Sequence, residues 1–300
     1  MNKTISVLIQ YRYLYLMLLP VVLYYLLFHY VPMFGAVIAF KDYTPGRGIM
    51  GSPWVGFSNF TDFFQSVYLW RLVRNTITIN LYELIFGFPA PIILALMLNE
   101  VRVRIFKSAV QTITYLPHFI SVVIAVGIVL DFFSTDGIIN ALVVAMGGKP
   151  ISFMTESSLF YPIFVGSNLW QHLGWRSIIY LAALSAINPS LYEAANVDGA
   201  GRWAKLKHIT LPGIMPIIVI MLILQIGNMM SVGFEKVMLM YNPSIYETAD
   251  VISTFVYRKG LQDMNFSYST AVGLINSAIN FTLLIFANTI SRRVSENSLW

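Results

Sequence analysis

The 300-residue sequence contains no cysteine, and only 11% of its residues are charged. The absence of cysteine excludes disulfide bonds, thiolate catalysis and cysteine-ligated metals. A soluble domain has about 25% charged residues, whereas this chain is 57% hydrophobic and lacks the polar surface to dissolve alone. The formal charge of +5 is too small and too scattered to indicate nucleic-acid binding. The composition therefore predicts an integral membrane protein.

Motifs for catalysis and cofactor binding are also missing. The sequence has no G-x-x-x-x-G-K-[ST] phosphate loop, because the Gly147-Gly148-Lys149 triplet is followed by Pro150. It has no H-E-x-x-H or G-x-S-x-G motif either. Its four histidines are far apart and share no motif: His29, His118, His172 and His208. We therefore predict a chain that is not an enzyme, ligates no metal and binds no cofactor of its own.

Long apolar runs are what the sequence has in abundance. A helix needs roughly 20 mostly apolar residues to cross the hydrocarbon core. Six runs meet this length: residues 13–40, 72–98, 113–133, 160–187, 213–233 and 268–290. The first is too long for a cleavable signal peptide and is interpreted as a retained anchor. The predicted fold is all-α and polytopic, with six transmembrane helices.

The distribution of lysine and arginine predicts the orientation. Residues 1–12, 99–112, 188–212 and 291–300 would share one side of the membrane. They carry the denser basic set: Lys3, Arg12, Arg102, Arg104, Lys107, Arg202, Lys205, Lys207, Arg292 and Arg293. Because cytoplasmic loops are enriched in basic residues, this side is the cytoplasm and both termini lie inside. We expect an anchor and first outer loop at 1–71, a core at 72–290 and a cytoplasmic tail at 291–300.

One cytoplasmic segment, YEAANVDGAGRWAKLKHITLP at residues 192–212, is unusually polar. Asn188-Pro189 places a capping residue before a proline, and Ser190 with Glu193 offers a competing capping box. Either signal begins a short helix, which the glycines of 199–201 end. A second short helix follows, and Pro212 is expected to end it where the fifth span begins. The segment is predicted to be a helix–turn–helix elbow with an apolar edge and a charged rim, which suits docking into a groove of a soluble partner.

The same segment carries a resemblance. Glu193-Ala194-Ala195, then Asp198-Gly199, then Ile209-x-Leu211-Pro212, resembles the EAA loop of permease subunits of binding-protein-dependent ABC importers. Its position between the fourth and fifth of six spans is the position that the loop has in that family. FHYVPMFGAVIAFKDY at 28–43, MNFSYSTAVG at 264–273 and SRRVSENSLW at 291–300 are similar to the carbohydrate-uptake branch, particularly its oligosaccharide and polysaccharide permeases.

The resemblance implies a MetI-like permease fold and a mechanism. The EAA loop would form a coupling helix in a cleft of an ATP-binding subunit, with Glu193 as a charged anchor and Gly199 as the turn. Ala194 and Ala195 would permit close approach. ATP and Mg would bind two copies of that separate subunit. The implied cargo is an oligosaccharide delivered by an extracytoplasmic solute-binding protein, and the implied location is the bacterial cytoplasmic membrane. Because an ATPase pair has two clefts, a second permease chain is expected, different from this one but similar.

Polar residues inside the spans are candidates for a substrate path, since such residues usually face a cavity or a neighbouring helix. Amide side chains bond hydroxyl groups, and indole rings stack on sugar faces. The candidates are Asn168, Trp170, Gln171, Trp175, Arg176, Gln225, Asn228, Asn276 and Asn280. For any one of them, helix-to-helix bonding or an interfacial aromatic belt is an alternative.

Several further interpretations stay open at this point. Glu83 and Arg176 are otherwise unpaired charges inside spans, which suggests an ion pair between them. Glu83 is also where an ion-coupled secondary transporter would bind its proton or sodium, although the internal repeat typical of that class is not evident. A non-transporting scaffold would not need the polar residues of the last three spans. Arg176 would suit an acidic saccharide, but the sequence leaves the sugar's identity open.

Overall fold

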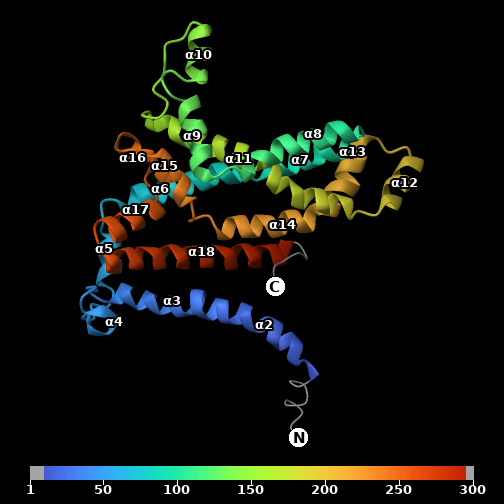
Figure 1. Cartoon of the computed structure of the whole chain (residues 1–300). Helices are drawn as coiled ribbons and strands as arrows, with labels where there is room; N and C mark the ends of the chain where they lie inside the picture. Colours follow the sequence, from blue (N-terminus) through green and yellow to red (C-terminus); the bar gives the residue numbers. More distant parts are fainter. Residues whose placement is uncertain (1–9, 295–300) are drawn as a thin grey trace. The chain divides into compact units, whose positions relative to one another are not determined.

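The computed structural model describes residues 10–294, which Figure 1 traces in chain order. Every regular element in that range is helical, and one isolated β-bridge joins Lys41 to Trp54. The longer helices are α2 (Arg12–Tyr25), α6 (Leu69–Tyr82), α7 (Pro89–Glu100), α8 (Arg104–Tyr115), α9 (Val122–Phe132), α11 (Phe160–Ser185), α14 (Leu211–Gly227) and α18 (Phe266–Val294). The shorter ones include α3 (Val31–Met33), α4 (Gly48–Gly51), α5 (Ser58–Phe64), α10 (Ile138–Ala145), α12 (Pro189–Val197), α13 (Arg202–Lys205), α15 (Phe234–Met240), α16 (Tyr246–Ala249) and α17 (Ile252–Tyr257). The predicted all-helical class is confirmed.

Four continuous helical stretches are long and apolar enough to cross a membrane. They are Arg12–Phe40, Leu69–Glu100, Arg202–Gly227 and Phe266–Arg293. They coincide with the first, second, fifth and sixth predicted spans. Three contain a π-helical turn, at Leu26–Tyr30, Glu83–Gly87 and Leu206–Thr210, which lets the helix continue through the prolines that follow. The described residues therefore contain several helices that are long and apolar enough to cross a membrane, as expected.

The third predicted span is not one straight helix. The helical stretch Arg104–Phe119 and the helix Val122–Phe132 meet at an angle of 104°. A 3-10 turn at Leu116–Phe119, which contains Pro117, ends the first part. Ser121 begins the second part, because its hydroxyl accepts a bond from the backbone N–H of Ile124 at 3.4 Å. This pair is either a broken span or a re-entrant loop, so a sharp bend interrupts the predicted span 113–133.

Helix α11, which occupies the fourth predicted span, is 26 residues long. At about 1.5 Å per residue it is longer than the roughly 30 Å hydrocarbon core. Nevertheless it is not one of the four apolar stretches. It carries Asn168, Gln171 and Arg176 along its length, and it packs against α6, α7, α8 and α14. Surrounded by other helices, it can cross a membrane without an apolar surface of its own.

The described residues divide into two compact units. One comprises residues 10–66 with Val256–Ile275, and the other Val67–Phe255 with residues 276–294. In the first unit, the Lys41 ammonium donates hydrogen bonds to the carbonyl oxygens of Ile49 (2.7 Å) and Ser52 (3.2 Å). The backbone N–H of Tyr43 donates to Ser267 Oγ at 2.8 Å. These bonds fold the chain after the first helix into an ordered loop.

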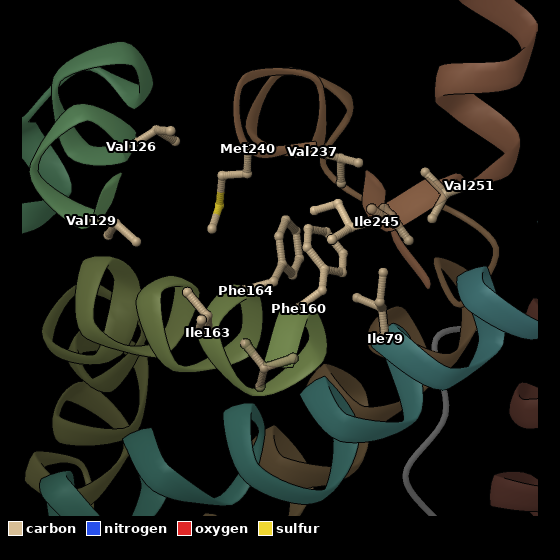
Figure 2. Packing of buried hydrophobic residues seen from close by; sticks show 13 residues of the cluster. Ile79, Val126, Val129, Phe160, Ile163, Phe164, Val237, Met240, Ile245 and Val251 are labelled. Atoms are coloured by element: carbon tan, nitrogen blue, oxygen red, sulfur yellow. The ribbon is translucent and has the colours of Figure 1, made fainter. Parts of the chain in front are cut away.

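The second unit is built around α11. Figure 2 shows Phe160 and Phe164 rising from α11 among Val126 and Val129 of α9 and Val237 of α15. A second cluster near the other end of α11 joins it to α7 and α14 through Ile92, Ala95, Tyr180, Leu184 and Ile214. Between these two apolar clusters α11 carries its polar residues, so the core itself leaves a polar section in the middle of the unit.

Residues 1–9 and 295–300 lie outside the described part of the chain. The predicted cytoplasmic position of Lys3 and most of the predicted tail at 291–300 fall there.

Candidate functional site

A cavity of about 660 Å³ lies in the second unit, in the polar section between the two core clusters. This volume falls within the roughly 300–1,000 Å³ of typical ligand sites. Its walls come from α6, α9, α11, α14 and α15 and from the segment between the last two. Its polar lining residues are Asn80, Glu83, Asn168, Gln171, His172, Arg176, Gln225, Asn228, Ser231, Glu235 and Lys236.

The predicted ion pair between Glu83 and Arg176 is confirmed. Arg176 Nη1 lies 3.3 Å from Glu83 Oε2, and the Glu83 side chain is 7% exposed. Asn168 Nδ2 donates to the other carboxylate oxygen at 2.5 Å. Gly87, one π-helical turn further along, leaves room for this carboxylate, because a Cβ there would overlap Glu83 Oε2. Glu83 therefore has both of its oxygens occupied by groups on α11.

Helical spacing explains why α11 lines so much of the cavity. Asn168, His172 and Arg176 follow one another at intervals of four, and Gln171 is three residues after Asn168. Such intervals place side chains on one face of a helix. The buried Ser177 hydroxyl, by contrast, donates to the Gly174 carbonyl oxygen of its own helix at 2.6 Å.

Lys236 is a cavity residue that sequence reasoning missed. It belongs to α15, after the last residue of the apolar stretch Arg202–Gly227, and lies between the fifth and sixth predicted spans. The folded chain buries it to 6% exposure, with its ammonium 3.4 Å from Gln171 Oε1. Burial lowers the pKa of Lys236 to about 8. The charge of Arg176 lowers this pKa as well, whereas the charge of Glu83 raises it. Asn80 and Ser231 also line the cavity and are absent from the predicted set.

The predicted substrate-path residues fall into two groups. Asn168, Gln171, Arg176, Gln225 and Asn228 line the cavity. The other four do not line it. Trp170 is 42% exposed, and Trp175 stacks on His118 with ring centroids 4.4 Å apart. Asn280 accepts a hydrogen bond from Met230 N (2.8 Å) and donates one to Ser231 Oγ (2.9 Å), whereas the buried Oδ1 of Asn276 has no partner among the described residues. Contact of either group with substrate stays a prediction.

The ion pair gives a direct prediction for Glu83→Gln, Arg176→Gln and the double variant. Removing one partner leaves the other charge unpaired in a cavity. The double variant should therefore lose less stability than the sum of the losses in the two single variants. We expect an interaction free energy of about 1–3 kcal/mol from thermal unfolding of the four forms in detergent. The Arg74–Glu247 pair is a matched control, since its side chains are 39% and 64% exposed. Its coupling should stay below about 1 kcal/mol. Additive losses at Glu83 and Arg176 would contradict the prediction.

The predicted elbow is present. Asn188 caps α12, with its side chain accepting from Ser190 N at 3.0 Å, so the Asn-Pro signal prevails over the capping box. Gly199 follows the helix with φ +73°, a conformation that favours glycine. The N–H of Ala200 then donates to the Ala195 carbonyl at 2.8 Å, which closes the turn.

The second half of the elbow differs from the prediction in one respect. Pro212 does not end the second helix, because α13, the π-helical turn Leu206–Thr210 and α14 form one continuous stretch. Pro212 occupies a first-turn position of α14, where its missing N–H is tolerated. The two halves are joined by a bond between the Tyr192 and Thr210 hydroxyls (3.0 Å) and by a hydrogen bond from Lys205 Nζ to Asn196 Oδ1. The elbow is thus tied to the helix that follows it.

The surface of the elbow is open. Glu193, Ala194, Asp198, Gly199 and Pro212 are exposed, whereas Ala195, Ile209 and Leu211 are partly buried. Two large apolar side chains also face outward, Val197 at 89% and Trp203 at 82% exposure. Within the second unit α12 lies at one end, far from α10 and α16 at the other (Figure 1).

The chain combines several apolar helices with a polar cavity among them and an exposed charged elbow. This organisation is that of a membrane transport subunit. A family model establishes which kind. The chain belongs to the family described as "Binding-protein-dependent transport system inner membrane component", whose model matches residues 87–296.

Relatives of known sequence align with nearly the whole chain. The polygalacturonan/rhamnogalacturonan transport system permease protein YteP of Bacillus subtilis is 46% identical over 98% of this chain and 92% of its own length. Protein LplB of the same organism is 45% identical over 96% and 91%. A chain of a bacterial alginate ABC transporter, solved with an alginate pentasaccharide-bound periplasmic protein, superposes with a TM-score of 0.92 at 43% identity and covers 99% of this chain and 100% of that one.

Proposed function

We propose that this chain is a permease subunit of an ABC importer that carries an oligosaccharide across the inner membrane. The observation that carries the proposal is the similarity over almost the entire length to a permease of a polygalacturonan/rhamnogalacturonan system and to a chain of an alginate importer. The polar cavity supports it, because its amide groups match the hydroxyl groups of a saccharide.

The partners follow from the same reasoning. The elbow, with exposed Glu193 and Val197, would dock into an ATP-binding subunit that supplies ATP hydrolysis. Six spans with both termini in the cytoplasm would place the elbow on the inner side and α10 on the outer side. One elbow per chain implies a second permease for the second ATPase copy. A solute-binding protein would deliver the saccharide from outside.

Ion-coupled secondary transport is the alternative that the charge in the second span suggested. Glu83 is engaged by Arg176 and Asn168, so its carboxylate is held in an ion pair and a hydrogen bond rather than free to bind a coupling ion. That alternative also leaves the exposed elbow without a role. The family and the engagement of Glu83 both favour the ATP-driven transporter.

Isolation of the chain from its native membrane in mild detergent, followed by mass spectrometry, tests the assembly. We expect an ATP-binding subunit, a second permease and a solute-binding protein to accompany it. Reconstitution of that assembly should give uptake of an oligosaccharide that depends on ATP and on the binding protein. A chain that purifies without an ATPase, and transports in response to an ion gradient, would contradict the proposal.

A further inference from the structure

The cavity contains an imbalance of charge. Glu83 and Arg176 form an ion pair, so their charges largely cancel. Glu235, which also lines the cavity, is exposed to solvent. Lys236 is the remaining cation of the lining, and it is buried. The lining of the cavity therefore contains one buried positive charge, that of Lys236, which forms no ion pair with a carboxylate of the described residues.

The contacts of Lys236 leave most of its hydrogen-bonding capacity unused. An ammonium group has three donors. One points to Gln171 Oε1 at 3.4 Å, and the Phe164 ring lies 5.8 Å from the nitrogen. A buried charge without an ionic partner is costly, and such residues in membrane proteins are usually functional. The position of Lys236 thus indicates that an anion completes its coordination when the cavity is filled.

The neighbours of Lys236 specify the rest of the ligand. Gln171 and Asn228 present amide groups to the same cavity, and Asn168 lies beside the ion pair. Amides recognise neutral hydroxyl groups as both donor and acceptor, whereas a carboxylate needs a cation. One cation among several amides fits a sugar ring that bears a carboxylate.

We propose that Lys236 binds a carboxylate of the transported saccharide, so that this residue makes the cavity selective for uronic-acid oligosaccharides. The inference rests on the proposed transport function and adds to it the residue that recognises the acidic group. Arg176, which suggested an acidic cargo from the sequence, is paired with Glu83 and is therefore not the primary contact.

The test compares an acidic ligand with its neutral form. Trigalacturonate carries a charged carboxylate on each ring, whereas its methyl ester carries a neutral and slightly larger ester group in the same place. Equilibrium binding of each ligand is measured on the detergent-purified transporter complex without its solute-binding protein. The selectivity of the solute-binding protein then does not contribute to the result. Wild type should bind the acid about tenfold or more tightly than the ester, as expected for a charge-assisted contact. Lys236→Gln should bind both ligands alike, and Lys236→Arg should retain the preference.

Lys149→Gln is the matched control, because Lys149 is an exposed lysine of the loop after α10 and does not line the cavity. It should keep the preference of wild type. The absence of an acid preference in wild type, or a preference that persists in Lys236→Gln, would overturn the inference. ATP-driven uptake is assayed after the same wild-type complex has been reconstituted into lipid vesicles together with its binding protein. Failure of that uptake would contradict the proposed function itself, so the two failures are distinguishable.

Discussion

Reversing the charge of Glu193 should uncouple this chain from ATP hydrolysis. The Glu193 side chain is exposed on α12 and makes no hydrogen bond or ion pair with another residue of the described range. Glu193→Arg should therefore leave the fold intact. At an interface with an ATPase, loss of a central charged contact typically costs 2 kcal/mol or more. We expect the amount of co-purified ATPase and the rate of ATP-driven uptake to fall about tenfold or more.

Glu100→Arg is the control for this change. Glu100 is also exposed, ends α7 and is predicted to lie on the same side of the membrane. An arginine at a helix C-terminus is electrostatically favourable, so this variant should fold and transport normally. Equal loss of transport in both variants, or normal ATPase binding by Glu193→Arg, would contradict the assignment of the elbow as the docking element.

The largest effect on stability is expected at Gly174. This buried glycine of α11 touches α8 so closely that a Cβ would overlap the carbonyl group of Thr114 and approach the Tyr115 ring. Because the obstacle is backbone, it cannot move aside, and the two helices would have to separate. Overpacking costs roughly 1–3 kcal/mol even where side chains can adjust. Gly174→Ala should cost at least the upper part of this range, and Gly174→Leu should prevent accumulation of the folded chain.

Gly166→Ala provides the comparison on the same helix. A Cβ at residue 166 meets nothing within 4 Å. Alanine is favoured over glycine within a helix by up to about 1 kcal/mol, so this variant should be as stable as wild type or more so. Thermal unfolding and size-exclusion profiles in detergent measure both. A Gly174→Ala protein as stable as Gly166→Ala would show that α8 and α11 do not pack in the way described.

Long apolar runs and the elbow were predictable from sequence because their signals are local. A run of twenty apolar residues indicates a span by composition alone, which is why Leu69–Glu100 and Arg202–Gly227 were found. Asn188-Pro189 and Gly199 indicate the ends of α12 through rules that concern only neighbouring residues. The Glu83–Arg176 pair was predictable because few charges occur inside spans, which leaves few possible partners.

Features that depend on tertiary packing could not be predicted in the same way. The 104° break beside Ser121 interrupts a run that remains apolar on both sides, so the period of the sequence does not reveal it. Pro117 is no guide, since membrane helices tolerate proline. Lys236 follows an apolar run and looks like an ordinary loop residue. It lines the cavity because α15 packs against α9. No local pattern records that contact.

The central claim, that the elbow meets an ATP-binding subunit, can be measured by cross-linking, because the chain has no cysteine to interfere. A cysteine at Val197, 89% exposed on α12, is compared with one at Met146, 80% exposed after α10. In native membranes, Val197→Cys with a short thiol-to-amine reagent should form an adduct with a nucleotide-binding ATPase subunit, and Met146→Cys should not. An elbow cysteine that captures no ATPase, or captures it no better than Met146→Cys, would contradict the account.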